Sequence, residues 1–382
     1  MAKKKLLFFS IFIIIILVFV LTIYNIIYKN NNIYLNNKDA APNFISIMLE
    51  ETVGSGEYKV SKSNKWPSKG YVFNKEMSYC NNGSTLTWNK NDNSVSVNIN
   101  KTDKCYVYFD IYQPTQPTLA EYIKSQYTGT QGENSLYYHN STLTNGAGDN
   151  SYRYAGASDS VNNYICLGSD ATTCPDANLF RIIGVFGNQT KVIRAKSVGY
   201  QQWHTSESNT WSSSSLNAYL NGTYLTSLGT IAEKIATTTW KVGGGSGSNI
   251  SASVPATAYK NEVGSSASTT IIDKKIGLMY VSDYGFAASP SAWTKILGDY
   301  DGTDANGTSI KTINWMYMGY NEWTISRHSD NTNSAFFVNS TGNVLGSNVR
   351  SDNGVRPSFN LESSVKYVSG SGSMSDPVRV TD

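Results

Sequence analysis

The sequence predicts a β-rich α+β protein with one N-terminal transmembrane helix, and three observations lead to this fold class. Residues 6–28 are apolar or aromatic apart from Ser10, Thr22 and Asn25, and they carry no charge. The rest of the chain contains short runs of alternating apolar and polar residues, as in Val95–Ile99, and this period of two is typical of half-buried strands. Tyrosine (26) and glycine (31) are plentiful while charged residues make up only 15%, a composition that favours short strands joined by polar turns.

The N-terminal segment is long enough to cross a membrane. At about 1.5 Å per residue, a helix over residues 6–28 would span roughly 34 Å, and a bilayer core is about 30 Å thick. Lys3, Lys4 and Lys5 precede it, so the positive-inside rule places residues 1–5 in the cytoplasm as a short tail. We therefore predict a single-pass protein of the cell membrane whose C-terminal part is extracellular.

A cleaved signal peptide is the alternative interpretation of this segment. The apolar part of a signal peptide is about 7–15 residues long and ends near a small-x-small cleavage site. Here the apolar run is longer, an asparagine-rich stretch follows at residues 30–37, and Ala40 and Ala41 come too late to form that site. The pattern favours an uncleaved signal-anchor.

The next two segments are predicted to be a stalk and a small β domain. Residues 29–68 look like a stalk with one short helix, which Pro42 would start and Gly54 would end. Residues 69–112 contain several strand-like runs separated by asparagine-rich and glycine-containing turns. The predicted strands of this small β domain are residues 71–73, 85–88, 95–99 and 105–109.

A linker and a second helix are predicted at residues 113–126. Two prolines make the start of this segment stiff, and Thr118 is followed three residues later by Glu121, the spacing of a helix capping box. From residue 127 to the end, residues 127–382, the pattern indicates one larger domain. Its predicted elements are a hairpin of residues 179–186 and 190–195, helices at 214–220 and 228–240, a flexible loop at 243–248, and strands at 275–281, 335–339 and 355–359.

Five motifs in the larger domain resemble a known family. They are Asn178–Phe186, Gly277–Gly285, Trp323–Arg327, Gly354–Pro357 and Gly370–Pro377, and they occur in that order. Over about residues 150–380 the chain resembles a domain of unknown function that is common in surface proteins of low-GC and gut bacteria. That domain is similar to the C-type-lectin-like and formylglycine-generating-enzyme folds, so the resemblance implies a C-type-lectin-like fold for the C-terminal domain.

The activities of those two folds do not carry over to this chain. Formylglycine-generating enzymes use cysteines late in the domain, and here no cysteine follows Cys174. Calcium-dependent lectins use Glu-Pro-Asn or Gln-Pro-Asp together with Trp-Asn-Asp, and none of these triplets occurs in the sequence. The resemblance therefore implies a fold more than a function.

The four cysteines predict two disulfides in an exported chain. Cys80 and Cys105 flank the small β domain, and Cys166 and Cys174 flank a short polar loop. An even number of cysteines in an oxidising compartment favours local pairing, which would stabilise the two loops by about 3.5 and about 2.5 kcal/mol. Free thiols and a metal site are the alternatives, although the shorter spacing suits zinc poorly and no histidine lies close in sequence.

The sequence does not predict an enzyme. The three histidines, His139, His204 and His328, are far apart, and no Gly-x-Ser-x-Gly nucleophile motif occurs. Acidic residues are sparse and form no local pair of the kind that hydrolyses glycosides. We predict no catalytic residues and no cofactor other than a possible calcium ion. The net charge of +3 is too small to indicate a nucleic-acid partner.

The acidic segment at residues 299–307 is the candidate calcium site. Clustered carboxylate and amide oxygens suit this ion, although the EF-hand pattern is not met. A tight acidic turn is the alternative interpretation. The four candidate metal ligands are Asp299, Asp301, Asp304 and Asn306.

Aromatic, arginine and asparagine side chains in the C-terminal region are the candidate ligand-binding residues. Tryptophan, tyrosine and arginine dominate protein-binding surfaces, and aromatic faces stack on sugar rings. The alternative is that the rings form a core poor in aliphatics, the interpretation that we favour for Trp323 and Arg356. The candidates are Trp293, Trp315, Tyr320, Arg327, Asn331 and Asn333.

Three functions are compatible with these patterns. The first is a membrane-anchored extracellular binding or display protein that recognises glycan or protein ligands. The second is a structural or partner subunit of a cell-envelope complex with no small ligand, and the third is an extracellular hydrolase or oxidase. A concave cleft lined by tryptophan and tyrosine favours the first, a flat apolar patch favours the second, and clustered carboxylates with raised pKa values favour the third.

Overall fold

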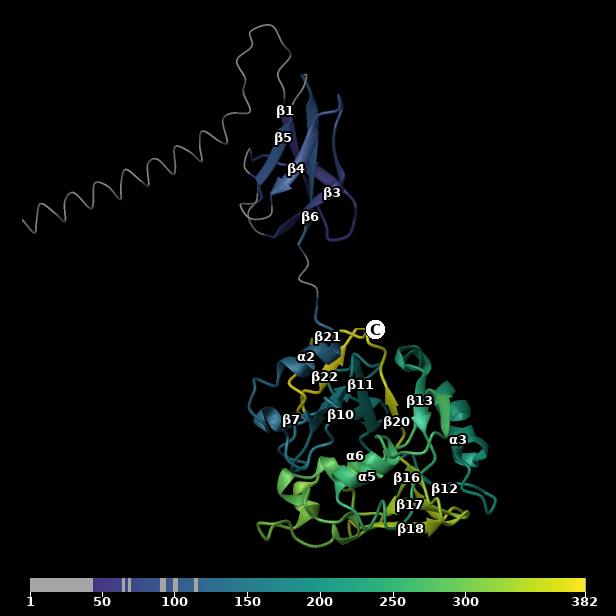
Figure 1. Cartoon of the computed structure of the whole chain (residues 1–382). Helices are drawn as coiled ribbons and strands as arrows, with labels where there is room; N and C mark the ends of the chain where they lie inside the picture. Colours follow the sequence, from purple (N-terminus) through teal and green to yellow (C-terminus); the bar gives the residue numbers. More distant parts are fainter. Residues whose placement is uncertain are drawn as a thin grey trace, which may run out of the picture. The chain divides into compact units, whose positions relative to one another are not determined.

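The computed structural model describes residues 44–63, 66–67, 70–89, 94–98, 102–112 and 116–381 (Figure 1). The chain divides into two compact units, residues 1–115 and residues 116–382, which are described separately below.

The described part of the N-terminal unit is built on a four-stranded sheet in the order β2-β1-β6-β3. A separate hairpin of β4 and β5 adds Trp88, which stacks on Phe73 of the sheet. Val107 and Phe109 alternate along β6 toward this side and form the centre of the core. The strands are β1 (Phe44–Glu50), β2 (Tyr58–Val60), β3 (Tyr71–Cys80), β4 (Thr85–Asn89), β5 (Ser94–Asn98) and β6 (Lys104–Ile111).

The predicted stalk helix after Pro42 is wrong, because residues 44–50 form strand β1. Ile45, Ile47 and Leu49 lie on the core side, and this alternation reflects the period of a strand rather than that of a helix. β1 pairs in parallel with β6, so this segment belongs to the small β domain and not to a stalk.

A nine-stranded sheet forms the centre of the C-terminal unit. Its main path runs β15-β20-β11-β10-β9-β22-β21, and β7 and β8 join it through β10. The predicted hairpin is confirmed as β10 and β11, which pair antiparallel. The strands of this sheet are β7 (Leu136–Tyr138), β8 (Tyr152–Tyr154), β9 (Tyr164–Cys166), β10 (Leu179–Phe186), β11 (Gln189–Arg194), β15 (Ile276–Gly277), β20 (Ser358–Asn360), β21 (Tyr367–Ser369) and β22 (Val378–Val380).

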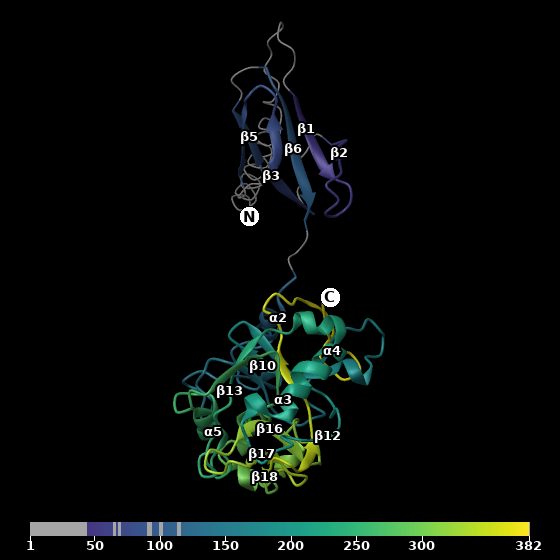
Figure 2. The same ribbon diagram turned by 90° about the vertical axis from the view of Figure 1, so that its right-hand side faces the viewer.

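A five-stranded sheet in the order β12-β19-β16-β17-β18 and a hairpin of β13 and β14 complete the strands of this unit. Both views place β16, β17 and β18 at the end of the unit away from α2 and the C-terminus (Figures 1 and 2). These strands are β12 (Tyr200–Gln202), β13 (Thr238–Lys241), β14 (Ile271–Lys274), β16 (Glu322–Arg327), β17 (Ser334–Val338), β18 (Val344–Asn348) and β19 (Asp352–Gly354).

Short helices cover the sheets of the C-terminal unit. The predicted capping box is confirmed at the start of α2, where Glu121 N–H donates to the Thr118 hydroxyl and the Glu121 carboxylate accepts from Thr118 N–H. The helices are α2 (Leu119–Ser125), α3 (Ser215–Tyr219), α4 (Leu225–Ser227), α5 (Pro255–Glu262) and α6 (Val281–Ala287), with a π turn at Leu220–Tyr224 and a 3-10 turn at Gly229–Lys234 between α3 and β13.

Two element predictions in this unit are wrong. The helix predicted at residues 228–240 is only a 3-10 turn, and its last residues enter β13, where Trp240 is buried. The strand predicted at residues 275–281 is reduced to β15, because Asp283 caps the start of α6 at Tyr280 and turns the chain into a helix.

The predicted fold class needs one correction. It contained a transmembrane helix at residues 6–28, which lies outside the described residues. Within the described ranges, no helix has the length and the apolar character needed to cross a membrane. For the described residues, the structure supports a β-rich fold with two disulfides, Cys80–Cys105 and Cys166–Cys174, and the transmembrane helix in the predicted fold class is not supported.

Candidate ligand-binding site

A buried lysine in the nine-stranded sheet forms the centre of the candidate site. Lys191 lies on β11, between β10 and β20, and its residue is only 5% exposed. Its ammonium nitrogen Nζ lies 2.5 Å from Oδ2 of Asp283, in the first turn of α6. The same oxygen accepts Tyr280 N–H at 2.8 Å, so the helix cap also orients the carboxylate toward the lysine.

A second buried cation, Arg153 on β8, approaches the same carboxylate. Its Nη1 lies 3.6 Å from Oδ1 of Asp283, and its Nη2 lies 2.7 Å from Oδ2 of Asp149. Gly184 makes this approach possible, since a Cβ atom at that position would meet the Tyr152 carbonyl at 2.2 Å. β8 therefore pairs closely with β10 and delivers Arg153 to the site.

Aromatic rings surround both cations. Lys191 Nζ lies 4.6 Å from the centroid of the Tyr280 ring and 5.4 Å from that of Trp240. Arg153 Cζ lies 4.6 Å from the Phe186 centroid and 5.1 Å from the Tyr259 centroid. All four distances are typical of cation–π contacts, which stabilise a positive charge that burial has partly removed from water.

These groups line a cavity of about 140 Å³. We call it the Lys191 pocket and define it by Arg153, Lys191, Trp240, Tyr280, Asp283 and Asn360. Phe186, Thr239 and Tyr259 also line it and are partly or fully exposed, so they form its mouth. The volume is smaller than the roughly 300–1,000 Å³ of pockets for drug-sized ligands, so it fits one ring or one short side chain.

Several polar atoms in the pocket retain bonding capacity. The side-chain carbonyl oxygen Oδ1 of Asn360 is buried without a hydrogen-bond partner, while the side-chain nitrogen Nδ2 donates to the Thr238 hydroxyl at 3.0 Å. The Lys191 ammonium has three N–H donors and makes one hydrogen bond, to Asp283. The Tyr280 hydroxyl accepts Lys241 N–H at 2.9 Å. A ligand would complete these bonds.

Burial sets the protonation of the pocket. It lowers the pKa of the Lys191 amine. The nearby Asp283 carboxylate raises that pKa and offsets part of the lowering. Burial also raises the pKa of the Tyr280 phenol far above its usual value, so this hydroxyl keeps its proton and remains a donor at neutral pH.

Glu262, at the end of α5, is almost completely buried and bonds the backbone of Ser282, which lines the pocket. Burial raises the pKa of its carboxyl group, and the hydrogen bonds that it accepts lower that pKa. Those bonds come from Val281 N–H at 2.9 Å, Ser282 N–H at 2.8 Å and the Ser326 hydroxyl. This carboxylate therefore holds the start of α6 in place.

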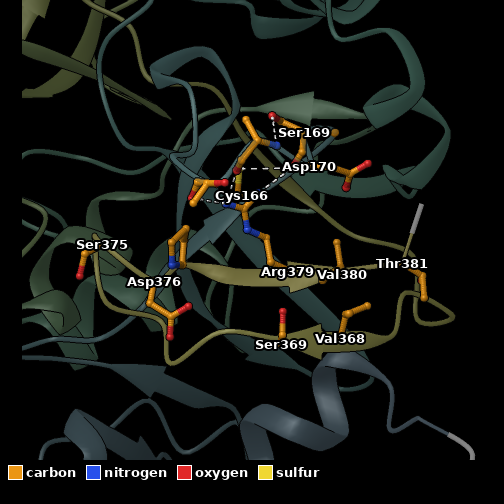
Figure 3. Close-up of a pocket in the computed structure, with 14 residues that line it drawn as sticks. Cys166, Ser169, Asp170, Val368, Ser369, Ser375, Asp376, Arg379, Val380 and Thr381 are labelled. Carbon is orange, nitrogen blue, oxygen red and sulfur yellow. Dashed lines mark hydrogen bonds between the residues drawn. The ribbon is translucent and has the colours of Figure 1, made fainter.

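A larger and more polar groove lies next to the Cys166–Cys174 disulfide (Figure 3). Its volume is about 470 Å³, and serine and threonine hydroxyls line much of it. Figure 3 shows Arg379 extending from β22 to the loop that carries Ser169. Its guanidinium donates to the carbonyls of Ser169 (2.6 Å), Ala171 (2.8 Å) and Thr172 (3.4 Å), so this cation clamps the loop that the disulfide closes.

The two predicted tryptophan ligands belong to the core. Trp293 is 0% exposed and Trp315 is 1% exposed. Their indole N–H groups donate to the carbonyls of Ala288 and Tyr154, both at 2.8 Å. The alternative interpretation of these rings as core is therefore correct, as it is for Trp323, and the prediction that they contact a ligand is wrong.

The other four predicted ligand residues lie near the surface in two different surroundings. Tyr320 is half-buried and packs near Tyr200. Arg327 donates to the Gly243 carbonyl at 3.1 Å and to Asn209 Oδ1 at 3.2 Å. Asn209 in turn donates to the carbonyl of Asn331, and Asn331 accepts the N–H of Asn333, so three of the predicted residues hold one loop together.

The predicted calcium segment forms a turn around Asp304. The carboxylate of Asp304 accepts the N–H groups of Asn306 at 2.9 Å and of Thr308 at 2.8 Å. Asp299 ends the neighbouring 3-10 turn Leu297–Asp299, and Asp301 N–H donates to Asn343 Oδ1 at 2.7 Å. The tight-turn alternative therefore accounts for Asp304, and calcium binding to this segment stays a prediction.

Among the described residues, one group of three potential metal-binding side chains comes together, Cys80, Asp103 and Cys105. Its two sulfur atoms already form a disulfide. Both predicted disulfides are present.

Residues 187–363 match the family model of a domain of unknown function (DUF6273). No curated protein and no solved structure matches the chain. The sequence predicted a domain of unknown function over about residues 150–380, and the match confirms one at residues 187–363. The expected likeness to the C-type-lectin-like and formylglycine-generating-enzyme folds is not shown by these comparisons.

Sequence reasoning missed the Lys191 pocket. The available signal was a lysine inside the strand Gln189–Arg194, next to Val192 and Ile193, where a charge needs a buried partner. The partner, Asp283, lies 92 residues away and becomes visible only in the fold.

Proposed function

We propose that the C-terminal unit is an extracellular recognition module that holds one small group of a glycan or protein ligand in the Lys191 pocket. One observation carries the proposal. A buried lysine and a buried amide carbonyl line a cavity walled by aromatic rings, and both have unused hydrogen-bonding capacity. Buried polar groups in proteins are usually satisfied, so unsatisfied ones beside a cavity favour a ligand site.

Two further observations support this function. Lys191, Trp240, Tyr280, Asp283 and Asn360 all fall within the residues that match the domain family, so the pocket is largely built by that domain. Both cysteine pairs form disulfides, which persist mainly outside the cytoplasm, and this supports a location outside the cell.

The proposal is tested by closing the mouth of the pocket without touching its buried groups. Thr239 is exposed and lines the pocket, so T239W should fill the entrance and leave the fold intact. Thr230 is also exposed but lies on the 3-10 turn outside the pocket lining, so T230W is the matched control.

The full-length protein and both variants are applied to an array of glycans and peptides. We expect the wild type and T230W to bind the same ligands and T239W to bind none of them. Equal binding by all three proteins would show that recognition, if present, occurs elsewhere on the chain.

A further inference from the structure

We infer that the Lys191 pocket takes an uncharged, hydroxylated ring, the chemistry of one neutral monosaccharide unit, rather than a charged group. This inference rests on the proposed function and names the class of ligand for the same site. Three properties of the pocket lead to it: its charge balance, its free hydrogen-bonding atoms and the flat rings that wall it.

The charges around the pocket already balance one another. Two cations, Lys191 and Arg153, face two carboxylates, Asp283 and Asp149. An anionic ligand would add an unmatched charge to a buried site, and burying an unpaired ion costs several kcal/mol.

A cationic ligand finds no carboxylate without a partner cation. Asp283 Oδ2 binds the Lys191 ammonium and Tyr280 N–H, and its Oδ1 faces Arg153. Asp149 Oδ2 binds Arg153, and its Oδ1 accepts the amide and the hydroxyl of Ser151. An ammonium group would therefore enter the pocket without the partner that its burial requires.

The atoms that remain free suit hydroxyl groups. Lys191 and the Tyr280 hydroxyl are donors, whereas the Asn360 carbonyl oxygen is an acceptor. A hydroxyl both accepts and donates, so neighbouring hydroxyls on one ring would satisfy donors and acceptor together. A carboxylate, which only accepts, would leave Asn360 unsatisfied.

The walls suit a ring with an apolar face. Trp240 and Tyr280 present adjacent rings, with centroids 6.0 Å apart. Aromatic faces bury the C–H side of a sugar ring well, and the cavity of about 140 Å³ limits the ligand to roughly one such ring.

The test uses small probes and the full-length protein. Saturation-transfer NMR and calorimetry are run with the methyl glycosides of glucose, galactose and mannose as neutral probes. Glucuronate is the anionic probe, glucosamine the cationic probe and alanine the zwitterionic probe. T239W shows whether any binding occurs in the pocket.

N360L removes the free carbonyl oxygen, and N249L, at an exposed position outside the pocket lining, is the matched control. We expect at least one neutral glycoside to bind the wild type and N249L equally. N360L should bind it about tenfold more weakly, the loss expected for one buried hydrogen bond. T239W should not bind it, which also covers the case in which N360L fails to fold.

Two results would overturn the inference, and they differ in what they leave standing. Binding of glucuronate, glucosamine or alanine that T239W abolishes, without binding of a neutral glycoside, would overturn the ligand class and keep the proposed pocket. Failure of every probe to bind, together with unchanged array binding by T239W, would overturn both the ligand class and the proposed pocket.

Discussion

Two of the buried ion pairs in the C-terminal unit, Arg356–Glu322 and Lys191–Asp283, differ in their surroundings. Arg356 Nε lies 2.5 Å from Glu322 Oε1, and its Nη2 donates to Glu322 Oε2 at 2.9 Å and to the Met316 carbonyl at 2.8 Å. Both side chains are at most 2% exposed. Lys191 and Asp283 are nearly as buried, but their pair lines a cavity and the lysine makes a single hydrogen bond.

This difference separates a structural pair from a candidate binding pair. The forked guanidinium of Arg356 matches a carboxylate through two parallel bonds and ties β16 to the segment before β20. The ammonium of Lys191 is a point charge with rotatable donors, so it holds Asp283 and still has donors for another group. Burial alone therefore does not mark a candidate site, and an unused donor does not mark one either, because Arg356 Nη1 is also buried without a partner. Lys191 is a candidate because its unused donors lie beside a cavity.

The largest effect is expected when the structural pair is broken. R356M leaves the Glu322 carboxylate buried without its partner, and burial already raises the pKa of that carboxyl despite the arginine. We expect a loss of about 3–5 kcal/mol in the free energy of unfolding, measured by urea denaturation. A loss below about 1 kcal/mol would mean that the pair contributes little to the fold.

Removing the shorter disulfide should destabilise the unit without affecting recognition. C166S with C174S frees the loop clamped by Arg379, and loop closure predicts a loss of about 2.5 kcal/mol. Ligand binding should be unchanged under conditions in which the variant is folded, because the loop does not line the Lys191 pocket. Lost binding by a folded variant would place the ligand in the groove of Figure 3 instead.

Breaking the pair in the pocket should cost less stability than breaking the structural pair. In K191M, Asp283 keeps Arg153 Nη1 at 3.6 Å and Tyr280 N–H at 2.8 Å. We expect a loss of about 2 kcal/mol in urea denaturation and the complete loss of ligand binding. A variant as unstable as R356M would show that Lys191 is mainly structural.

The last prediction concerns the pH dependence of stability. Burial raises the pKa of the Asp149 carboxyl, but Arg153 and Ser151 lower it more, so in the folded protein it lies well below its usual value. A carboxyl whose pKa is lower in the folded protein than in the unfolded chain, where it is about 3.9, stabilises the fold at pH values above about 3.9. This stabilisation is lost as the pH falls from about 3.9 toward the folded pKa, and each unit of pKa difference contributes about 1.4 kcal/mol.

This prediction is measured as the melting temperature between pH 5 and pH 2. We expect the wild type to lose more stability over this range than D149N, whose amide does not titrate. Parallel curves for the two proteins would show that Asp149 is not coupled to Arg153 in solution.

Local signals in the sequence predicted the local parts of the fold. The capping box of Thr118 and Glu121, the hairpin at residues 179–195 and both disulfides depend on neighbours in sequence, and all are present. The segment after Pro42 was misinterpreted because its apolar residues fit a helix and a strand alike, and pairing with β6, from a distant part of the sequence, decides between them.

Local sequence signals of this kind could not predict the candidate site. Tryptophan is common on binding surfaces, so the sequence made Trp293 and Trp315 candidates, but only the fold shows that both are buried. Lys191, Arg153 and Asp283 come from three separate elements, and Gly184 brings β8 close enough for them to meet. A site assembled from distant segments leaves no spacing pattern in the sequence.

Ligand binding by two double variants tests the central claim most directly. E322L with R356M replaces the structural pair by apolar side chains, and K191M with D283N removes the charges of the pocket pair while keeping an acceptor for Tyr280 N–H. Each variant is checked for folding by circular dichroism and then titrated with the ligand found on the array. The account predicts unchanged affinity for the first variant and no binding for the second. Equal affinity in both folded variants would contradict it.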